Sequence, residues 1–184
     1  MSLEDAKRAA RTAAFARRKP AFGAAPADCC SHLRAVLACH RGAAVSGFLP
    51  IRTEIDPTPA MAGAALSGQV GVPVIEGAGL PLRFALWTPD CALVAGPFGA
   101  MVPEVPHWMT PRIVIVPLLA FTAAGGRLGY GGGFYDRTLQ GLRARGPVVS
   151  VGFAFAAQQV DDLPLDPNDQ PLDMIVTEAG VITP

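Results

Sequence analysis

Apolar runs separated by amphipathic segments recur along the chain and predict its strands. The strongest is RIVIVPL over residues 112–118, whose near-continuous β-branched side chains are typical of a strand buried on both faces of a sheet. The alternating run LRFALW over 82–87 favours a strand at a sheet edge. Further short apolar runs predict strands over 43–49, 69–75, 147–155 and 172–178.

Helical patterns fill the intervals between these strands, over 2–19, 28–39, 58–66 and 134–145. Ser2 and Asp5 form a capping-box pattern at the start of the first helix, and Pro20 is expected to end it. Asp28 is expected to cap the second helix. Strands that alternate with helices predict an α/β fold, a three-layer α/β/α arrangement with a mainly parallel central sheet, in a single domain spanning 1–184.

Residues 88–111 are rich in Pro and Gly and show little periodicity. They predict either a long functional loop or a short extra hairpin. Trp87, His107 and Trp108 flank this segment. A cover over a bound ligand is one interpretation of the two tryptophans. Ordinary packing is favoured, because large aromatic side chains are usually partly buried.

Composition and charge limit the classes of function. With 51% hydrophobic and 16% charged residues, the chain is expected to form a globular core and not to remain disordered. The formal net charge of +0 predicts no general attraction to nucleic acid or to an anionic membrane, so an anionic ligand needs a local cluster of cations. The chain lacks a long apolar run and an apolar signal core, so we expect a cytoplasmic protein that crosses no membrane. We also expect a monomer.

The segment around the second predicted helix holds candidate zinc ligands, which are Cys29, Cys30, His32, Cys39 and His40. They include no pair with C-x2-C spacing, and a single helix cannot wrap its side chains around an ion. Small, partly buried helix residues are therefore the favoured interpretation. Without an export signal, disulfides are not expected either.

The stretch GGRLGYGGGFYDRTL, residues 125–139, follows the strongest predicted strand and continues into the last predicted helix. In an α/β fold, the loop that leaves the carboxyl end of a strand lies at the ligand crevice. Its glycines let backbone N–H groups approach an anion closely, beside the partial positive charge of a helix N-terminus. Arg127 supplies a fork for two phosphate oxygens, and Asp136 is a candidate Mg²⁺ ligand. The arrangement suits a nucleoside triphosphate.

The standard phosphate loops do not match this stretch. A Walker A motif requires a lysine that is absent here, and GxGxxG fails because Phe134 stands where a third glycine is required. The alternative to anion binding is a glycine-rich turn packed under the helix, with Arg127 and Asp136 solvated or paired.

The string RLGYGGGFYDRTL resembles the signature of the 5-formyltetrahydrofolate cyclo-ligase family. Upstream, KRAAR contains the family's Lys-xxx-Arg pair as Lys7 and Arg11, and FLPIRTEID over 48–56 is similar to the family segment around Glu54. Downstream, VGFAFAAQQV and LPLDPNDQPLDMIVTE match the family's closing pattern in order and spacing. The resemblance covers nearly the full chain.

The resemblance implies an enzyme that uses ATP and Mg²⁺ to convert 5-formyltetrahydrofolate into 5,10-methenyltetrahydrofolate, releasing ADP and phosphate. Phosphoryl transfer to the formyl oxygen is implied to give an iminium phosphate, which the folate N10 then attacks. The protein supplies mainly positioning and charge neutralisation to such a reaction.

The resemblance also implies roles for individual residues. The implied ATP-binding residues are Lys7, Arg11, Arg127, Leu128, Gly129, Tyr130, Gly131, Gly132, Gly133, Phe134 and Tyr135. The implied folate contacts are Leu49, Glu54, Tyr130, Gly132 and Phe134, the implied Mg²⁺ ligands are Asp136 and Asp169, and the implied catalytic residues are Arg127 and Tyr135. No role is implied for Arg8, Arg17 and Arg18, which we expect on the solvated face of the first helix.

Four positions depart from the family pattern. Phe134 stands where many relatives have Tyr, and Gly132 stands where some have Lys. Thr122 stands where relatives often have an Asp after the strand predicted over 112–118. Arg112 stands where that strand usually begins with an Asp. The Phe134 ring retains stacking without a hydroxyl contact.

The retained Arg127, Asp136 and Asp169 favour an active enzyme over a non-catalytic folate- or nucleotide-binding protein of the same fold. An enzyme acting on acyl or sugar phosphates is a second alternative. It would need a nucleophilic Glu or a catalytic Lys in the crevice, and the sequence offers no candidate.

Overall fold

Eight strands form the central sheet within residues 2–184, the part of the chain that the computed structural model describes. Their bounds are β1 Val45–Ser46, β2 Val70–Val74, β3 Arg83–Leu86, β6 Trp108–Met109, β7 Ile113–Pro117, β10 Val149–Phe153, β11 Met174–Thr177 and β12 Gly180–Ile182. The spatial order is β12-β11-β10-β7-β1-β2-β3-β6. The inner pairings, from β2 across to β11, are parallel, and the outer ones are antiparallel. The predicted mainly parallel α/β sheet is confirmed.

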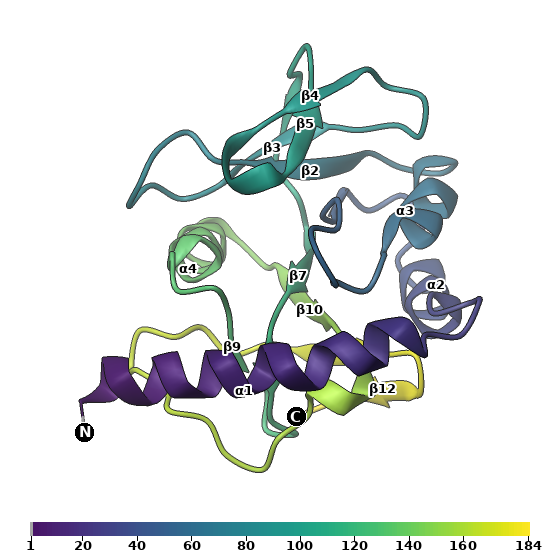
Figure 1. Ribbon diagram of the computed structural model, residues 1–184. Coiled ribbons are helices and arrows are strands. Elements are labelled where there is room, and N and C mark those ends of the chain that lie inside the picture. Colours follow the sequence, from purple (N-terminus) through teal and green to yellow (C-terminus); the bar gives the residue numbers. More distant parts are fainter. Residues whose placement is uncertain (1) are drawn as a thin grey trace.

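Helices cover both faces of this sheet. They are α1 Leu3–Gly23, α2 Ser31–Ala38, α3 Thr58–Ala65 and α4 Phe134–Arg145. Helix α4 lies on one side of β7 and β10, and α2 and α3 lie on the other (Figure 1). Strand β7 shows why both faces need a cover: Ile113 and Ile115 belong to the core beneath α2 and α3, while Val114 and Val116 pack with Leu139 of α4. Within the described residues, every helix is too short or too polar to cross a bilayer.

Helix α1 runs across the carboxyl ends of the central strands instead of stacking on a face (Figure 1). Ala14 of this helix packs against Leu119 and Leu128, in the segment that follows β7. The predicted capping box is confirmed, since the Asp5 N–H donates to Ser2 Oγ at 3.1 Å and the Ser2 N–H donates to Asp5 Oδ2 at 3.3 Å. The first turns of α1 are therefore fixed beside the edge where a ligand site is expected.

Two predicted helix boundaries are wrong. Pro20 lies inside α1, and the helix continues because Ala21 packs against the core and the Ala24 N–H closes the last turn on the Pro20 carbonyl at 3.0 Å. Such contacts outweigh the backbone hydrogen bond that a proline removes. Asp28 does not cap α2, because its carboxylate accepts the Cys30 N–H before the helix begins.

Two strand predictions also need correction, and the strand at the C-terminal edge of the sheet was missed. The run 82–87 is not an edge strand, because β6 pairs alongside β3. The run 43–49 forms only the two-residue β1, since its later residues turn toward the ligand edge. The final strand β12, which pairs antiparallel with β11, was not predicted.

The hairpin interpretation of 88–111 is confirmed. Strand β4 Leu93–Ala95 pairs antiparallel with β5 Met101–Pro103, and a 3₁₀ turn, η1 Pro97–Gly99, joins them. Trp87 is buried in the core, as ordinary packing predicts, and Trp108 stacks under the Arg83 guanidinium at 3.7 Å from its ring centroid. The structure does not support the ligand-cover interpretation, because neither Trp87 nor Trp108 lines the cavity described below.

Candidate functional site

A cavity of about 480 Å³, within the range usual for small-molecule sites, lies beside the carboxyl end of β7. It is bordered by α1, by the loop after β1, by the β4–β5 hairpin and by the glycine-rich stretch before α4. Every residue to which the sequence assigns a role lines it: Lys7, Arg11, Leu49, Glu54, Arg127, Leu128, Gly129, Tyr130, Gly131, Gly132, Gly133, Phe134, Tyr135, Asp136 and Asp169. The structure thus brings these residues together, while their roles toward a ligand stay predictions.

The glycine-rich stretch begins as a short hairpin and ends as the cap of α4. Strand β8, Ala120–Phe121, pairs with β9, Arg127–Leu128. Gly131 has φ +99°, and a Cβ there would lie 3.0 Å from the guanidinium of Arg11. Gly133, with φ +63°, directly precedes α4. Only glycine meets both requirements without strain, so the loop exposes bare backbone next to a cation.

Arg127 and Asp136 form a buried ion pair. The Arg127 side chain is 5% exposed, and its Nη2 lies 2.6 Å from Asp136 Oδ1. The other guanidinium nitrogen, Nη1, donates to the Gln170 carbonyl. The Gln170 N–H in turn donates to Asp136 Oδ1 at 2.9 Å. Both side chains are therefore held in one orientation, pointing to a shared position on the cavity wall.

A second ion pair lies beside the first. Lys7 Nζ lies 2.8 Å from Asp169 Oδ2, which also accepts the Asp166 N–H at 2.8 Å. The residue after Asp169 supplies the amide that holds Asp136, so the two pairs share one segment of backbone. We call Lys7, Arg127, Asp136 and Asp169 the charged cluster.

Glu54 and Tyr130 form a polar pair in a different part of the lining. The Tyr130 hydroxyl donates to Glu54 Oε1 at 2.7 Å, and the Ile51 N–H donates to Oε2 at 2.9 Å. Burial raises the pKa of Glu54, while these two hydrogen bonds and the charges of Arg18 and Arg52 oppose the rise. Burial, with the Glu54 charge, also raises the pKa of Tyr130, so its hydroxyl stays a donor.

Tyr135 offers a hydroxyl with no partner. This oxygen is buried and, among the described residues, meets no hydrogen-bond acceptor. Burial raises the pKa of Tyr135, and the Glu54 charge raises it further, so the hydroxyl is protonated at neutral pH. The hydroxyl is therefore an unused hydrogen-bond donor beside the cavity.

Phe98 was missed by the sequence analysis. It lies in the turn η1, is 76% exposed, and adopts φ +59°, which is unfavourable for a bulky residue. Its ring centroid lies 6.3 Å from that of Phe134, across the cavity lining. An aromatic residue next to Gly99 within a Pro- and Gly-rich loop was the available signal. We call Glu54, Tyr130, Phe134 and Phe98 the aromatic cluster.

Arg18 contradicts the expectation of a solvated residue. Its side chain is fully buried, at 0% exposure, and its Nε donates to Thr53 Oγ1 at 3.0 Å. The guanidinium carbon lies 5.7 Å from the Tyr130 ring centroid and 5.3 Å from that of Phe15. Arg18 comes eleven positions after Lys7, so both side chains lie on the same face of α1. This face points toward the site. Arg8, by contrast, is exposed.

Thr122 holds the turn before β9 through two hydrogen bonds with Gly126. Its Oγ1 accepts the Gly126 N–H at 3.2 Å, and its own N–H donates to the Gly126 carbonyl at 2.9 Å. The residue is buried. The turn that leads into β9 is therefore anchored without the acidic residue that the family pattern has at this position.

Of the cysteines near α2, Cys30 belongs to the core, Cys29 packs against it and Cys39 is exposed. Cys30 is buried, its thiol donates to the Asp56 carbonyl, and burial raises its pKa to about 11. Across residues 2–184, three or more His, Cys, Asp or Glu side chains nowhere converge as a ready-made metal site. Asp136 and Asp169 would thus serve a metal only together with oxygens from a ligand or water.

Comparison with known proteins decides the family. The model of the 5-formyltetrahydrofolate cyclo-ligase family matches residues 6–178. The chain belongs to this family. The match extends from α1 through β11, so it includes every lining residue to which the sequence assigns a role, from Lys7 to Asp169.

Individual relatives agree with this assignment. The chain is 40% identical over 96 residues to a 5-formyltetrahydrofolate cyclo-ligase of Haemophilus influenzae, covering 50% of this chain and 51% of that protein. It is 33% identical over 128 residues to the corresponding protein of Mycolicibacterium smegmatis, covering 64% of each. The aligned segments thus span less than two thirds of either relative.

Solved structures share the fold. The 5,10-methenyltetrahydrofolate synthetase of Aquifex aeolicus superposes with a TM-score of 0.69 and 25% identity, covering 100% of this chain and 93% of that one. The 5,10-methenyltetrahydrofolate synthetase of Mycoplasma pneumoniae gives a TM-score of 0.65 at 19% identity, covering 94% of this chain and 98% of that one.

Proposed function

We propose that this protein catalyses the ATP-dependent ring closure of 5-formyltetrahydrofolate to 5,10-methenyltetrahydrofolate, with release of ADP and phosphate. The observation that carries the proposal is a single cavity that joins the charged cluster to the aromatic cluster. Phosphate oxygens suit the first group of residues, and a flat heterocycle with N–H donors suits the second. Membership in the family and the names of the relatives support the same reaction.

The chemical difficulty is that a formyl oxygen is a poor leaving group. In the proposed reaction, the bond between ADP and the γ-phosphorus breaks while a bond from phosphorus to the formyl oxygen forms. The folate N10 then attacks the formyl carbon and loses its proton, and the carbon–oxygen bond breaks with phosphate as the leaving group. Positioning and stabilisation of charge suffice for such steps.

The charged cluster and the glycine-rich loop are the proposed triphosphate site. Lys7, Arg11 and Arg127 all line the cavity, and Arg11 lies against the bare backbone of Gly131. The start of α4 adds its partial positive charge. Because Lys7 and Arg127 are paired with carboxylates, a triphosphate would take over these cations by displacing their present partners.

Asp136 and Asp169 are the proposed ligands of Mg²⁺. The two carboxylates suit a hard cation that is usually held by one or two carboxylates plus phosphate oxygens and water. When bound, the ion neutralises phosphate charge. The two carboxylates would be free to hold the ion if Lys7 and Arg127 paired with phosphate instead.

The aromatic cluster is the proposed folate site. The Glu54 carboxylate, already oriented by Tyr130, would accept hydrogen bonds from pterin N–H groups, and Leu49 would add apolar contact. Phe134 and Phe98 present ring faces on which the folate can stack. The unpaired Tyr135 hydroxyl is proposed as the donor to the formyl or phosphoryl oxygen where charge develops.

The test mixes the protein with 5-formyltetrahydrofolate and Mg-ATP and follows the absorbance of methenyltetrahydrofolate. We expect a signal that requires both ATP and Mg²⁺, with stoichiometric ADP. Calorimetric binding of folate or ATP with no product at high enzyme concentration would instead favour the non-catalytic binding protein. Absence of both binding and product would reject the proposal.

A further inference from the structure

Arg18 is a buried cation that the proposed reaction has not used. Its side chain is 0% exposed, and Nη1 and Nη2 meet no hydrogen-bond partner among the described residues. The only polar atom that it binds there is Thr53 Oγ1, through Nε. Burying an arginine without a paired carboxylate is costly, so a fold that keeps one needs a compensating benefit.

The surroundings of Arg18 point to the folate site. Its guanidinium lies beside the Tyr130 ring, and its Thr53 contact is the residue directly before Glu54. Arg18 therefore lies beside the Tyr130 ring and is linked to Glu54 through the side chain of its neighbour Thr53. It does not line the cavity itself, so it acts from behind the residues that do.

We propose that Arg18 is a positioning residue of the folate site, which holds the Tyr130–Glu54 pair in orientation and compensates the negative charge of the Glu54 carboxylate. The inference rests on the proposed function, because it assigns Glu54 to the folate. A carboxylate accepts two hydrogen bonds from neighbouring N–H groups, whereas its protonated form has to donate one. Keeping Glu54 ionised in a buried place is therefore a condition for binding.

The other charged and titratable groups around Glu54 do not replace this cation. Tyr130 donates a hydrogen bond but carries no positive charge, and Tyr135 is neutral. Arg52 also favours the ionised carboxylate, but it lines the cavity and is exposed to solvent, which weakens its field. Burial raises the pKa of Glu54, and Arg18 is the buried charge that opposes it.

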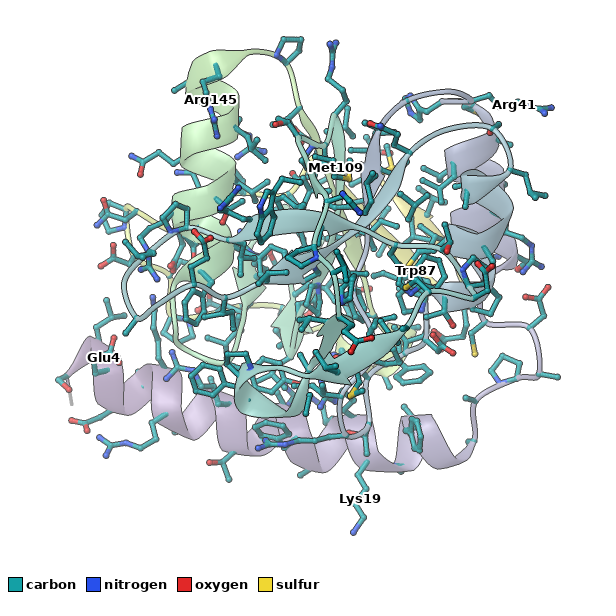
Figure 2. All side chains as sticks on the ribbon, turned by 90° about the horizontal axis from the view of Figure 1, so that it is seen from above. Glu4, Lys19, Arg41, Trp87, Met109 and Arg145 are labelled. Atoms are coloured by element: carbon teal, nitrogen blue, oxygen red, sulfur yellow. The ribbon has the colours of Figure 1, made fainter. Side chains whose placement is uncertain are left out.

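The test compares Arg18→Met with Lys19→Met. Lys19 is the next residue of α1 and points away from the protein (Figure 2). For Arg18→Met we expect the KM for 5-formyltetrahydrofolate to rise about 10- to 100-fold at neutral pH, with the KM for ATP unchanged. The acid limb of kcat/KM for folate should move to higher pH, because Glu54 then takes up a proton more easily. Lys19→Met should change neither constant.

A double-mutant cycle separates positioning from a general structural effect. If Arg18 acts through Glu54, Arg18→Met combined with Glu54→Gln should give the same folate KM as Glu54→Gln alone. Arg18→Lys, which keeps the charge, should lie between wild type and Arg18→Met, and it carries the same cycle should Arg18→Met fail to fold.

The outcomes keep this inference distinct from the proposed function. Wild-type protein that makes no methenyltetrahydrofolate rejects the proposed function itself. If the wild-type protein is active, two results would overturn only the role of Arg18. One is that the Arg18 and Glu54 substitutions have additive effects on the folate KM. The other is that Arg18→Met leaves the folate KM and the pH profile unchanged.

Discussion

The charged cluster and the aromatic cluster meet in one cavity but differ in how far their groups are already satisfied. In the charged cluster, each of the two cations is paired with a carboxylate. In the aromatic cluster, the Glu54–Tyr130 pair is complete, while the Phe98 ring is largely exposed. The first cluster therefore has to exchange partners when a ligand binds, and the second offers a formed acceptor and an uncovered ring. The comparison predicts that charged residues control turnover and aromatic residues control folate affinity.

The largest effect is expected for Arg127→Met. It removes a guanidinium proposed to stabilise the transferred phosphoryl group, so kcat should fall about 10²- to 10³-fold. Absorbance of the product measures kcat, and circular dichroism checks the fold. Arg145→Met is the control, since Arg145 is the last residue of α4, at the end remote from Glu4 and from the cavity (Figure 2). Equal turnover in both variants would contradict the prediction that the charged cluster controls turnover.

A somewhat smaller effect is expected for Asp136→Asn. The Mg²⁺ concentration that gives half-maximal turnover should rise about 10- to 100-fold, because one proposed ligand loses its charge. A Mg²⁺ titration at saturating ATP measures this. Asp161→Asn, at an exposed carboxylate, is the matched control. An unchanged Mg²⁺ requirement would exclude Asp136 from the metal site.

Phe98→Ala tests whether the aromatic cluster controls folate affinity. Loss of one stacking face should raise the KM for folate about 10-fold and leave kcat and the KM for ATP close to wild type. Steady-state kinetics with each substrate varied in turn separates these constants. Val94→Ala, at an exposed position of the same hairpin, should have no effect. A matching rise in the KM for ATP would show that the two clusters are not separate.

The smallest effect is expected for Ser2→Ala. Loss of the capping box should lower the free energy of unfolding by about 1 kcal/mol, as measured by urea denaturation. Because α1 also carries Lys7, fraying of the first turn should raise the KM for ATP slightly more than that for folate. A larger rise in the KM for folate than in the KM for ATP would contradict the assignment of the start of α1 to the charged cluster.

The sequence predicts best where local and long-range preferences agree. Helix α4 has the predicted bounds, because Gly133 fixes its start and Gly146 follows its last residue. Strand β7 is continuous in β-branched residues and lies in the middle of the sheet. In the glycine-rich loop, the family signature names residues that do converge on one cavity.

Other features depend on contacts that a linear pattern does not contain. Pro20 predicts a helix end, but packing of the following turn outweighs its local preference. Arg18 looks like its neighbours Arg17 and Lys19, and only the path of α1 over the Tyr130 ring makes it a buried residue. Phe98 stands out in its Pro- and Gly-rich loop, but the sequence does not show that the β4–β5 hairpin brings its ring to 6.3 Å from that of Phe134.

The path of α1 has a consequence for which mutations this protein can tolerate. Lys7, Arg11 and Arg18 share one helix face, and their spacing alone sets which atoms meet the two clusters. A substitution at one position removes one contact. Insertion or deletion of a single residue between Lys7 and Arg18 would turn the rest of the helix by about 100° and shift it by about 1.5 Å. Lys7 and Arg18 could then no longer meet their partners in the two clusters at the same time, so α1 should accept varied outward-facing residues but not a change of length.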